Sequence, residues 1–434
     1  MEPDGKPALK PKLRFPEFRD AEGWTTEMLG SVASLSTEKV GDKTCIPMSI
    51  TSGVGLVSQM EKFGRIIAGS SYKNYLLLIK NDFAYNKSAT KEYPEGFIAL
   101  YSGDELAAVP NSIFTCFRIK GDSPAPQYLN YLFLGNLHGQ WLRKFIEVGA
   151  RAHGSLSIDE DDLLALPVPL PKGESSLPEQ QKIADCLTSM DELIAAQARK
   201  LDALKTHKKG LMQQLFPCEG ETQPRLRFPE FQNVGEWEYA PLGNLLMGTP
   251  DYGVNAAAVP FSERLPKYLR ITDISEDGLY LSDKRVSVDL EATDGNYLDE
   301  GDIVLARTGA SVGKSYRYRK EDGKLVFAGF LIRVKPDQSR LISTYLANFL
   351  TTVQFWEWVA VTSARSGQPG INSTEYSSLA IPLPPDLPEQ QRIADCLTIL
   401  DDLIAAQTQK LEALRTHKKG LMQQLFPSPE DVEA

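Results

Sequence analysis

Two stretches of the chain, 177–217 and 387–427, carry apolar residues at spacings that alternate between four and three. In each stretch eight of the ten positions of this pattern are apolar, and in the first these are Ile183, Leu187, Met190, Ile194, Leu201, Leu204, Leu211 and Leu215. A stripe sustained for about five heptads predicts a long helix that buries one face against another helix. At ~1.5 Å per residue, about 38 helical residues extend over roughly 57 Å.

The two stretches are near-identical copies, which lie 210 residues apart and differ at eight of 41 positions. A shorter string, Leu13–Phe18, recurs as Leu226–Phe231. Because the copies are so alike, the favoured arrangement packs the two helices on each other; the alternative places each helix on its own domain. Polar residues in such a seam set register or partner choice. Those that interrupt this one are Gln197, Lys208, Gln407 and Lys418.

The regions between the copies, 1–176 and 218–386, share a plan without sharing a sequence. Strands are predicted at Tyr75–Ile79, Phe97–Tyr101 and Ile113–Lys120 in the first region, and at Tyr268–Ile271, Ile303–Arg307, Lys314–Arg319 and Leu325–Lys335 in the second. Helical stretches follow, from Gln127 to about Phe145 and from Ser339 to about Val361, and each region leaves through an extended proline-rich segment. This order of strands and helices predicts that each region forms a mixed α/β domain.

Composition narrows the class of protein. The chain has 434 residues, of which 42% are hydrophobic, and its formal net charge is −10. An acidic balance argues against a protein that coats nucleic acid non-specifically, since such proteins are basic overall. Five cysteines without a C-x-x-C pair and four histidines predict neither a disulfide framework nor a metal site. With no apolar run of ~18 residues and no signal peptide at its start, we expect a cytoplasmic protein that does not enter a membrane.

One string resembles a phosphate-binding loop, Gly309-Ala-Ser-Val-Gly-Lys-Ser315. The G-x-x-x-x-G-K-[ST] pattern requires glycine where this chain has Thr308. The residues that follow alternate as in a strand and reach an Asp-Gly turn at 322–323, which predicts a hairpin with the run 325–335 instead of the helix that such a loop needs. No complete active site is found, and an enzyme that uses this string for nucleotide chemistry is kept as an alternative.

A binding surface is the remaining candidate. Between Arg307 and Lys320 five basic residues and two tyrosines occur without an acidic residue, and small residues there let backbone N–H groups approach an anion. The candidates for contact with DNA in the second region are Arg307, Thr308, Ser311, Lys314, Arg317, Arg319, Arg365, Ser366, Gln368 and Asn372. Those in the first region are Tyr85, Asn86, Lys87, Lys91 and Arg151, with Arg143 and Lys144 beside them. The alternative is a solvated basic hairpin.

The arrangement resembles the specificity (S) subunit of type I restriction-modification systems. Three elements carry the resemblance: the string at 11–18 with its copy at 224–231, the string Ile303–Lys314, and the proline-rich junction that leads into L-P-E-Q-Q-[KR]-I-A at the start of each long helix. The first region departs from the family's pattern, because it lacks the Ala-Arg-Thr-Gly of 306–309. Its DNA contacts are therefore less well defined.

The resemblance implies an α/β (α+β) fold with a pseudo-twofold internal repeat. Two target-recognition domains, 1–176 and 218–386, would be joined by antiparallel helices at 177–217 and 387–427 that form a coiled-coil spacer, with an acidic tail at 428–434. Each domain would read one half of an asymmetric bipartite site in double-stranded DNA. Two modification (methyltransferase) subunits would methylate adenine with S-adenosylmethionine, and restriction subunits would add translocation and cleavage driven by ATP and Mg. The chain itself would bind no cofactor and catalyse nothing.

A structural protein is the main rival hypothesis. In that interpretation the coiled coil is a scaffold and its two α/β domains bind other proteins. Binding to DNA with a steep dependence on salt, measured together with a methyltransferase partner, distinguishes the two hypotheses.

Overall fold

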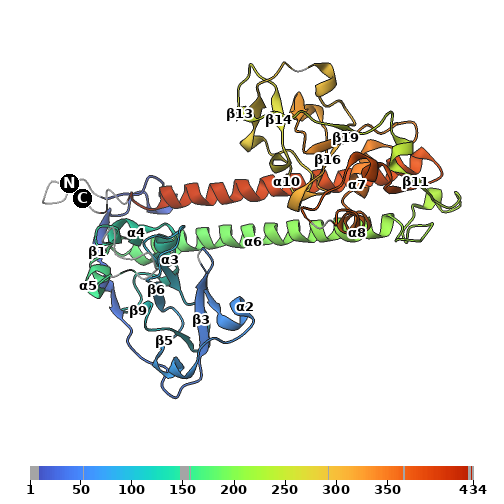
Figure 1. Cartoon of the computed structure of the whole chain (residues 1–434). Helices are drawn as coiled ribbons and strands as arrows, with labels where there is room; N and C mark the ends of the chain where they lie inside the picture. The colour runs from blue at the N-terminus through green and yellow to red at the C-terminus, as the bar shows by residue number, and fades with distance from the viewer. Residues whose placement is uncertain are drawn as a thin grey trace. The chain divides into compact units, whose positions relative to one another are not determined.

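The computed structural model describes residues 9–51, 53–146, 156, 158–291, 293–364, 367–428 and 432. The chain divides into two compact units: unit 1 comprises Met1–Ala198 and Lys410–Ala434, and unit 2 comprises Arg199–Gln409. Both predicted long helices are present, as α6 (Ser176–Leu215) and α10 (Leu387–Leu425) (Figure 1). Since each helix crosses from one unit to the other, every unit contains parts of both.

Unit 1 is built on two four-stranded sheets and one two-stranded sheet. Before α6 its elements are β1 (Trp24–Met28), α1 (Leu29–Val32), β2 (Ala33–Leu35), β3 (Ile46–Thr51), β4 (Gly55–Ser58), α2 (Gln59–Phe63), β5 (Leu76–Leu78), β6 (Phe83–Asn86), β7 (Phe97–Leu100), β8 (Ala107–Val109), β9 (Phe114–Ile119), α3 (Pro126–Leu134), α4 (Leu137–Leu142), α5 (Glu160–Leu164) and β10 (Pro167–Pro171). The sheet orders are β2-β9-β6-β7, β4-β3-β8-β5 and β1-β10, and only β3 and β8 pair in parallel.

Unit 2 repeats this plan. Between the long helices its elements are β11 (Glu238–Pro241), β12 (Asp251–Tyr252), β13 (Ala258–Pro260), β14 (Lys267–Leu269), β15 (Val286–Val288), β16 (Ile303–Ala306), β17 (Ser315–Arg317), β18 (Leu325–Phe327), β19 (Leu331–Val334), α7 (Ser343–Phe349), α8 (Val353–Thr362), α9 (Ser373–Ser377) and β20 (Ala380–Leu383). The sheet orders are β12-β19-β16-β17, β13-β15-β14-β18 and β11-β20, with β14 and β18 parallel. The second sheets differ at their edges, where β5 adds to β8 in unit 1 and β13 adds to β15 in unit 2.

The two long helices pack on each other within each unit, as the repeat predicted, and they run antiparallel, as the family resemblance implied. In unit 1 the start of α6 shares a hydrophobic core with the end of α10, and Lys418 Nζ lies 2.5 Å from Asp191 Oδ1. In unit 2 the end of α6 meets the start of α10, and Lys208 Nζ lies 2.5 Å from Asp401 Oδ1. The lysines that interrupt the apolar stripe are thus ion-paired to the opposite helix.

The short repeated string near the start of each unit fastens the unit to a long helix. Arg14 and Glu179 form a buried ion pair at 2.7 Å, and its counterpart in unit 2, between Arg227 and Glu389, has the same distance. Removing one member of such a pair leaves a buried charge and costs ~3–5 kcal/mol. The repeated L-R-F-P-E-F string therefore has a structural role, which is to dock the domain on the first turn of the helix.

Several local predictions need correction. The helix expected from Gln127 to Phe145 is two helices, α3 and α4, because Asn136 between them adopts a left-handed backbone conformation with φ 64°. The second expected helix divides at Thr352, whose side chain caps α8. The run Leu325–Lys335 is likewise two strands in different sheets, β18 and β19.

The predicted hairpin of Lys314–Arg319 with the run after it is wrong. β17 pairs with β16, which precedes it, and β18 pairs with β14. The proline-rich exits, in contrast, are strands: β10 and β20 each pair with one short strand, where missing N–H donors can be tolerated.

Candidate nucleic-acid interface

The loop between β16 and β17, residues 307–314, lies at one end of the β12-β19-β16-β17 sheet of unit 2. Gly309 and Gly313 both have positive φ, 77° and 87°, which favours glycine at these positions. A Cβ at Gly313 would lie 2.8 Å from Val359, so the loop also packs closely on α8. The string is followed by a strand and lacks the helix N-terminus on which phosphate-binding loops depend.

This loop is joined to a second segment that the sequence analysis singled out, residues 367–372. The backbone N–H of Gly309 donates to the carbonyl of Pro369 at 3.0 Å, and that of Ile371 donates to the carbonyl of Arg307 at 2.9 Å. Thr308 and Gly370 face each other in an antiparallel bridge. The fold thus brings together two candidate segments that are about 60 residues apart in the sequence. Arg365 and Ser366 lie outside the described residues.

Arg307 is oriented by aromatic and backbone groups. Its guanidinium carbon lies 4.8 Å from the ring centroid of Tyr252, and its Nε is buried without a hydrogen-bond partner among the described residues. Its backbone N–H donates to Phe330, whose side chain is 63% exposed. No carboxylate in the described part of the chain forms an ion pair with Arg307. Its charge is therefore available to a ligand.

Tyr252 and Phe330 are surface aromatic residues that sequence reasoning missed. Tyr252 is 43% exposed, and its hydroxyl donates to Ser373 Oγ and accepts the Ser373 N–H, both at 3.1 Å. These two hydrogen bonds lower the pKa of the Tyr252 phenol. Tyr252 lies outside the predicted elements and the basic run, and Phe330 lies in the run predicted as one strand, Leu325–Lys335, so the sequence carried no signal that either ring is exposed.

The other basic residues of 307–320 are mostly neutralised by acids from elsewhere in the chain. Lys314 pairs with Glu276 at 2.7 Å, and Lys320 pairs with Glu300 at 3.2 Å. Arg319 pairs with Asp322 at 3.4 Å. Because these acids are brought in by folding or lie just past the stretch, an acid-free sequence does not give an acid-free surface.

The tyrosines and the polar candidates of this stretch divide between core and surface. Tyr316 and Tyr318 are buried, so they do not present their rings to a ligand. Gln368 is exposed, and Asn372 is exposed while its Oδ1 caps α9 by accepting the N–H of Glu375 at 2.9 Å. The half-buried candidates of the loop and β17 are Thr308, Ser311 and Arg317.

Lys87 occupies in unit 1 the place that Arg307 occupies in unit 2. Each follows the central strand of its sheet, β6 or β16. The N–H of Lys87 donates to Ile113 at 2.9 Å, and its carbonyl accepts the N–H of Leu156 at 2.7 Å. The N–H and carbonyl of Arg307 make the same two kinds of bond, with Phe330 and Ile371, at 3.1 and 2.9 Å. Unit 1 therefore has a lysine at the position of the missing arginine.

The remaining candidates of unit 1 are distributed unevenly. Tyr85 has no exposed surface and donates its hydroxyl to the carbonyl of Glu95 at 2.9 Å, which places it in the core instead of the expected surface. Asn86 is 7% exposed, and its Oδ1 accepts the N–H of Ser88 at 3.0 Å. Lys91 is exposed, whereas Arg151 lies outside the described residues. Tyr85 and Asn86 point to opposite faces of β6, and both are buried because all four residues of this strand are covered.

Arg143 and Lys144, which stand beside these candidates, already have partners. Arg143 Nε donates to the buried Glu95 carboxylate at 2.7 Å. The ammonium of Lys144 lies 4.6 Å from the ring of Trp141. Arg143 and Lys144 are exposed but held by these partners, whereas Lys87 and Lys91 reach the surface without an ion pair among the described residues.

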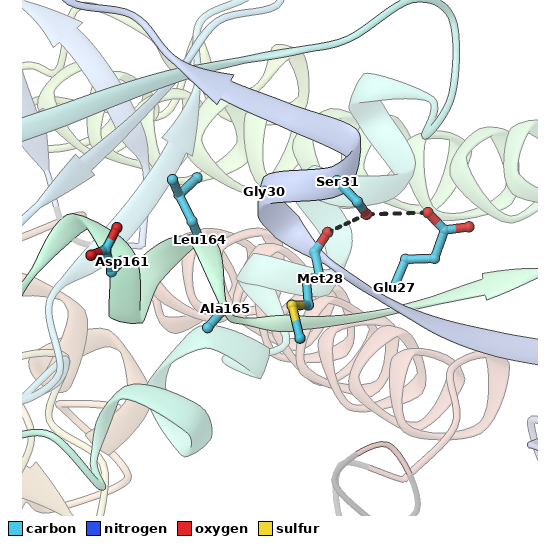
Figure 2. Close-up of a pocket in the computed structure, with 7 residues that line it drawn as sticks. All are labelled: Glu27, Met28, Gly30, Ser31, Asp161, Leu164 and Ala165. Atoms are coloured by element: carbon cyan, nitrogen blue, oxygen red, sulfur yellow. Dashed lines mark hydrogen bonds between the residues drawn. The ribbon is translucent and has the colours of Figure 1, made fainter.

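A surface hollow of about 560 Å³ lies in unit 1 between α1 and α5 (Figure 2). Its lining includes Met28, Leu164 and Ala165 with the carboxylates of Glu27 and Asp161, while the Ser31 hydroxyl is bonded to the carbonyl of Met28 at 2.7 Å. The same hydroxyl lies 3.3 Å from Glu27 Oε2, and the described lining includes no histidine, cysteine or lysine beside this contact. Over the described ranges, no three or more His, Cys, Asp or Glu side chains are grouped to hold a metal ion. Among the helices described, none is both long and apolar enough to cross a membrane.

Known proteins resemble this chain along most of its length. The type I restriction modification DNA specificity domain family matches residues 262–416. A Methanocaldococcus jannaschii protein assigned as the specificity subunit of the type I restriction enzyme MjaX is 26% identical over 363 residues, which cover 80% of this chain and 78% of that protein.

Two solved structures share the fold. The type I restriction-modification S subunit from M. genitalium matches with a TM-score of 0.56 and 12% identity, over 97% of this chain and 100% of that one. A chain from a study of complex assembly and conformational transition of the type I R-M system matches with a TM-score of 0.56 and 17% identity, over 96% and 100%. The same combination of two α/β domains and two long packed helices thus recurs in these proteins.

Proposed function

Since this chain belongs to the specificity subunits of type I restriction-modification systems, which are themselves non-catalytic, we propose that it reads an asymmetric bipartite DNA site, one half with each recognition domain. The proposed domains are the regions expected from the sequence, 1–176 and 218–386. Each would contact DNA through the loop after its central strand, with Lys87 in the first domain and Arg307 in the second.

The observation that carries this proposal is that the two loops share one backbone arrangement but carry different side chains. Lys87 and Arg307 are held by matching backbone hydrogen bonds, yet the residues around them differ: Ile113 is half-buried where Phe330 is exposed. A common frame places both loops in the same way relative to their own sheets. Different side chains on that frame suit the recognition of two different base sequences.

The repeat also supports two copies of one partner. Several positions of α6 and α10 are identical between the two helices although the described part of the chain leaves them exposed in both. They include Gln181 and Gln391, Thr206 and Thr416, His207 and His417, Lys209 and Lys419, and Gln213 and Gln423. We propose that these equivalent faces bind two modification subunits, which would supply S-adenosylmethionine. Restriction subunits, where they join, would bring ATP and Mg.

Sequencing of DNA methylation in cells that carry this protein and its modification subunit tests the proposal. The expected result is adenine methylation at one bipartite motif, with one methylated base in each half and a spacer of constant length. Exchanging residues 218–386 for the same region of a relative should replace one half-site and leave the other. Absence of a motif, together with binding of the complex to proteins and not to DNA, supports the scaffold hypothesis instead.

A further inference from the structure

Tyr252 is fixed at three points although much of its surface is open. Its backbone pairs with Ile332 across β12 and β19. Its hydroxyl is bonded twice to Ser373, at the start of α9, and its ring lies 4.8 Å from the guanidinium carbon of Arg307. Next to it, a Cβ at Gly253 would lie 2.2 Å from the carbonyl oxygen of Phe327, so the chain leaves this strand along a closely packed path.

A ring orients a guanidinium differently from a carboxylate. A carboxylate accepts the N–H groups of an arginine and so uses the donors that a DNA ligand would need, as Asp322 does with Arg319. An aromatic ring attracts the face of the guanidinium and leaves the N–H groups at its edge. Tyr252 therefore restricts the plane of Arg307 without using its donors.

We propose that Tyr252 is the positioning residue for Arg307 in DNA recognition by unit 2. Its ring sets the plane in which the guanidinium meets a pair of acceptors, such as O6 and N7 of guanine or two oxygens of a phosphate. This inference rests on the proposed function. None of the described aromatic side chains stacks with Lys87, so the described part of unit 1 shows no equivalent of the Tyr252–Arg307 contact.

Rates of methylation by the complete complex of this chain with its modification subunits test the assignment. The substrates are oligonucleotides with the methylated motif and with every single-base change in the half-site that unit 2 reads. Tyr252→Leu, which removes the ring, should reduce discrimination by roughly two- to fivefold, the range expected for an exposed cation–π contact. Tyr252→Phe, which keeps the ring and loses both bonds to Ser373, should retain most of it.

The decisive readout is the combination with Arg307→Ala. If Tyr252 acts through Arg307, the double variant discriminates no worse than Arg307→Ala alone. A loss of discrimination confined to one base pair identifies a base edge as the acceptor. An equal loss of methylation rate on every oligonucleotide identifies a phosphate. A matched control is Phe261→Leu, since Phe261 stacks with Arg285 at 4.0 Å in the same unit and should leave discrimination unchanged.

Two results would overturn the assignment. One is an effect of Tyr252→Leu that adds in full to that of Arg307→Ala; the other is an equal change in the half-site read by unit 1. Thermal unfolding of each variant, and the unit 1 half-site as an internal reference, separate these results from misfolding. Failure of the proposed function differs from both, because the unaltered complex would then methylate no bipartite motif at all.

Discussion

Arg307 and Lys87 occupy equivalent positions but offer a DNA base different chemistry. A guanidinium presents two parallel N–H donors, while an ammonium is a single mobile charge. We predict that Arg307→Ala weakens binding only through the half-site of unit 2, by ~1–3 kcal/mol if the side chain contacts a base. Lys87→Ala should weaken binding only through the half-site of unit 1. Affinities of the complex at one salt concentration, for DNA altered in one half-site at a time, give both values.

The two variants are each other's controls. If either substitution weakens recognition of both half-sites equally, the division of labour between the units is wrong. Unchanged affinity for Arg307→Ala would remove the 307–314 loop from the interface, whatever the behaviour of Lys87.

His138 is a buried titratable group that DNA recognition does not use. It has no exposed surface, lies against the rings of Tyr85 and Phe133, and its Nε2 is 3.3 Å from the carbonyl oxygen of Gly96. Burial lowers the pKa of His138 to about 4. Between the ordinary value of ~6.5 and 4, the unfolded chain binds a proton that the folded chain does not. The free energy of unfolding must therefore fall as the pH falls through this window.

We predict that His138→Gln removes part of this pH dependence, because glutamine can still bond to Gly96 and does not titrate. Between pH 7 and pH 4.5 the unaltered protein should lose more stability than the variant, by about 1–3 kcal/mol. Urea unfolding of the full chain at several pH values measures the difference. Parallel pH profiles for the two proteins would contradict the prediction.

At the scale of elements, the long helices carry paired charges in a mostly apolar seam. Lys208 is 20% exposed and Asp401 50% exposed, so their ion pair is partly shielded from water. We predict that Lys208→Asp or Asp401→Lys alone destabilises the helix pair by about 1 kcal/mol, and that the double exchange restores most of the loss. Thermal unfolding of the three variants and of the unaltered protein completes the double-mutant cycle. The pair of Lys418 and Asp191 should behave alike, and additive losses in either cycle would show that the charges do not interact.

The elements that could be predicted from sequence are those whose signal is local. The two long helices were predicted to within two residues at either end. Their apolar pattern repeats over about ten turns, so a single polar residue does not obscure it. The short strands carry a weaker signal. In β6 (Phe83–Asn86) all four residues are buried, so buried and exposed positions do not alternate. The break between α3 and α4 depends on the left-handed Asn136, whose conformation no periodic pattern encodes.

The candidate site was predictable in its loops and not in its details. Its two segments, 307–314 and 367–372, carried compositional signals, but their pairing through Thr308 and Gly370 is a tertiary contact. Likewise, the acids that neutralise Lys314 and Lys320 come from outside the basic stretch. Tyr252 is held in part by Ser373, which is 121 residues away. Contacts between distant segments, and not the residues themselves, decide which charges remain for a ligand.

At the scale of the whole molecule, the acidic balance of −10 bears on how DNA is bound. Long-range attraction to phosphates requires positive charge, and most lysines and arginines of the 307–320 stretch are already paired with acids. We therefore expect the chain alone to bind DNA weakly and the complex with its modification subunits to bind tightly. This division suits a subunit that contributes selectivity while its partners contribute affinity.

The helices give the molecule an adjustable length, which leads to the last prediction. Inserting four residues into a helix adds ~6 Å to it. Because α6 and α10 pack on each other, the insertion that preserves their pairing is a matched one, which duplicates Leu201–Leu204 in α6 and Leu411–Leu414 in α10. We predict that this variant methylates the same two half-sites across a longer spacer. Methylation sequencing reads both quantities at once.

An insertion in α6 alone is the control, since it shifts one helix against the other and should lower thermal stability before it changes the spacer. The matched variant separates the two roles assigned to the chain. In the proposed function, recognition resides in the loops after β6 and β16, which the insertion does not touch, and spacing is set by the helices, which it lengthens. A changed half-site with an unchanged spacer would mean that the helices take part in reading bases, and the model of two readers on a spacer would fail.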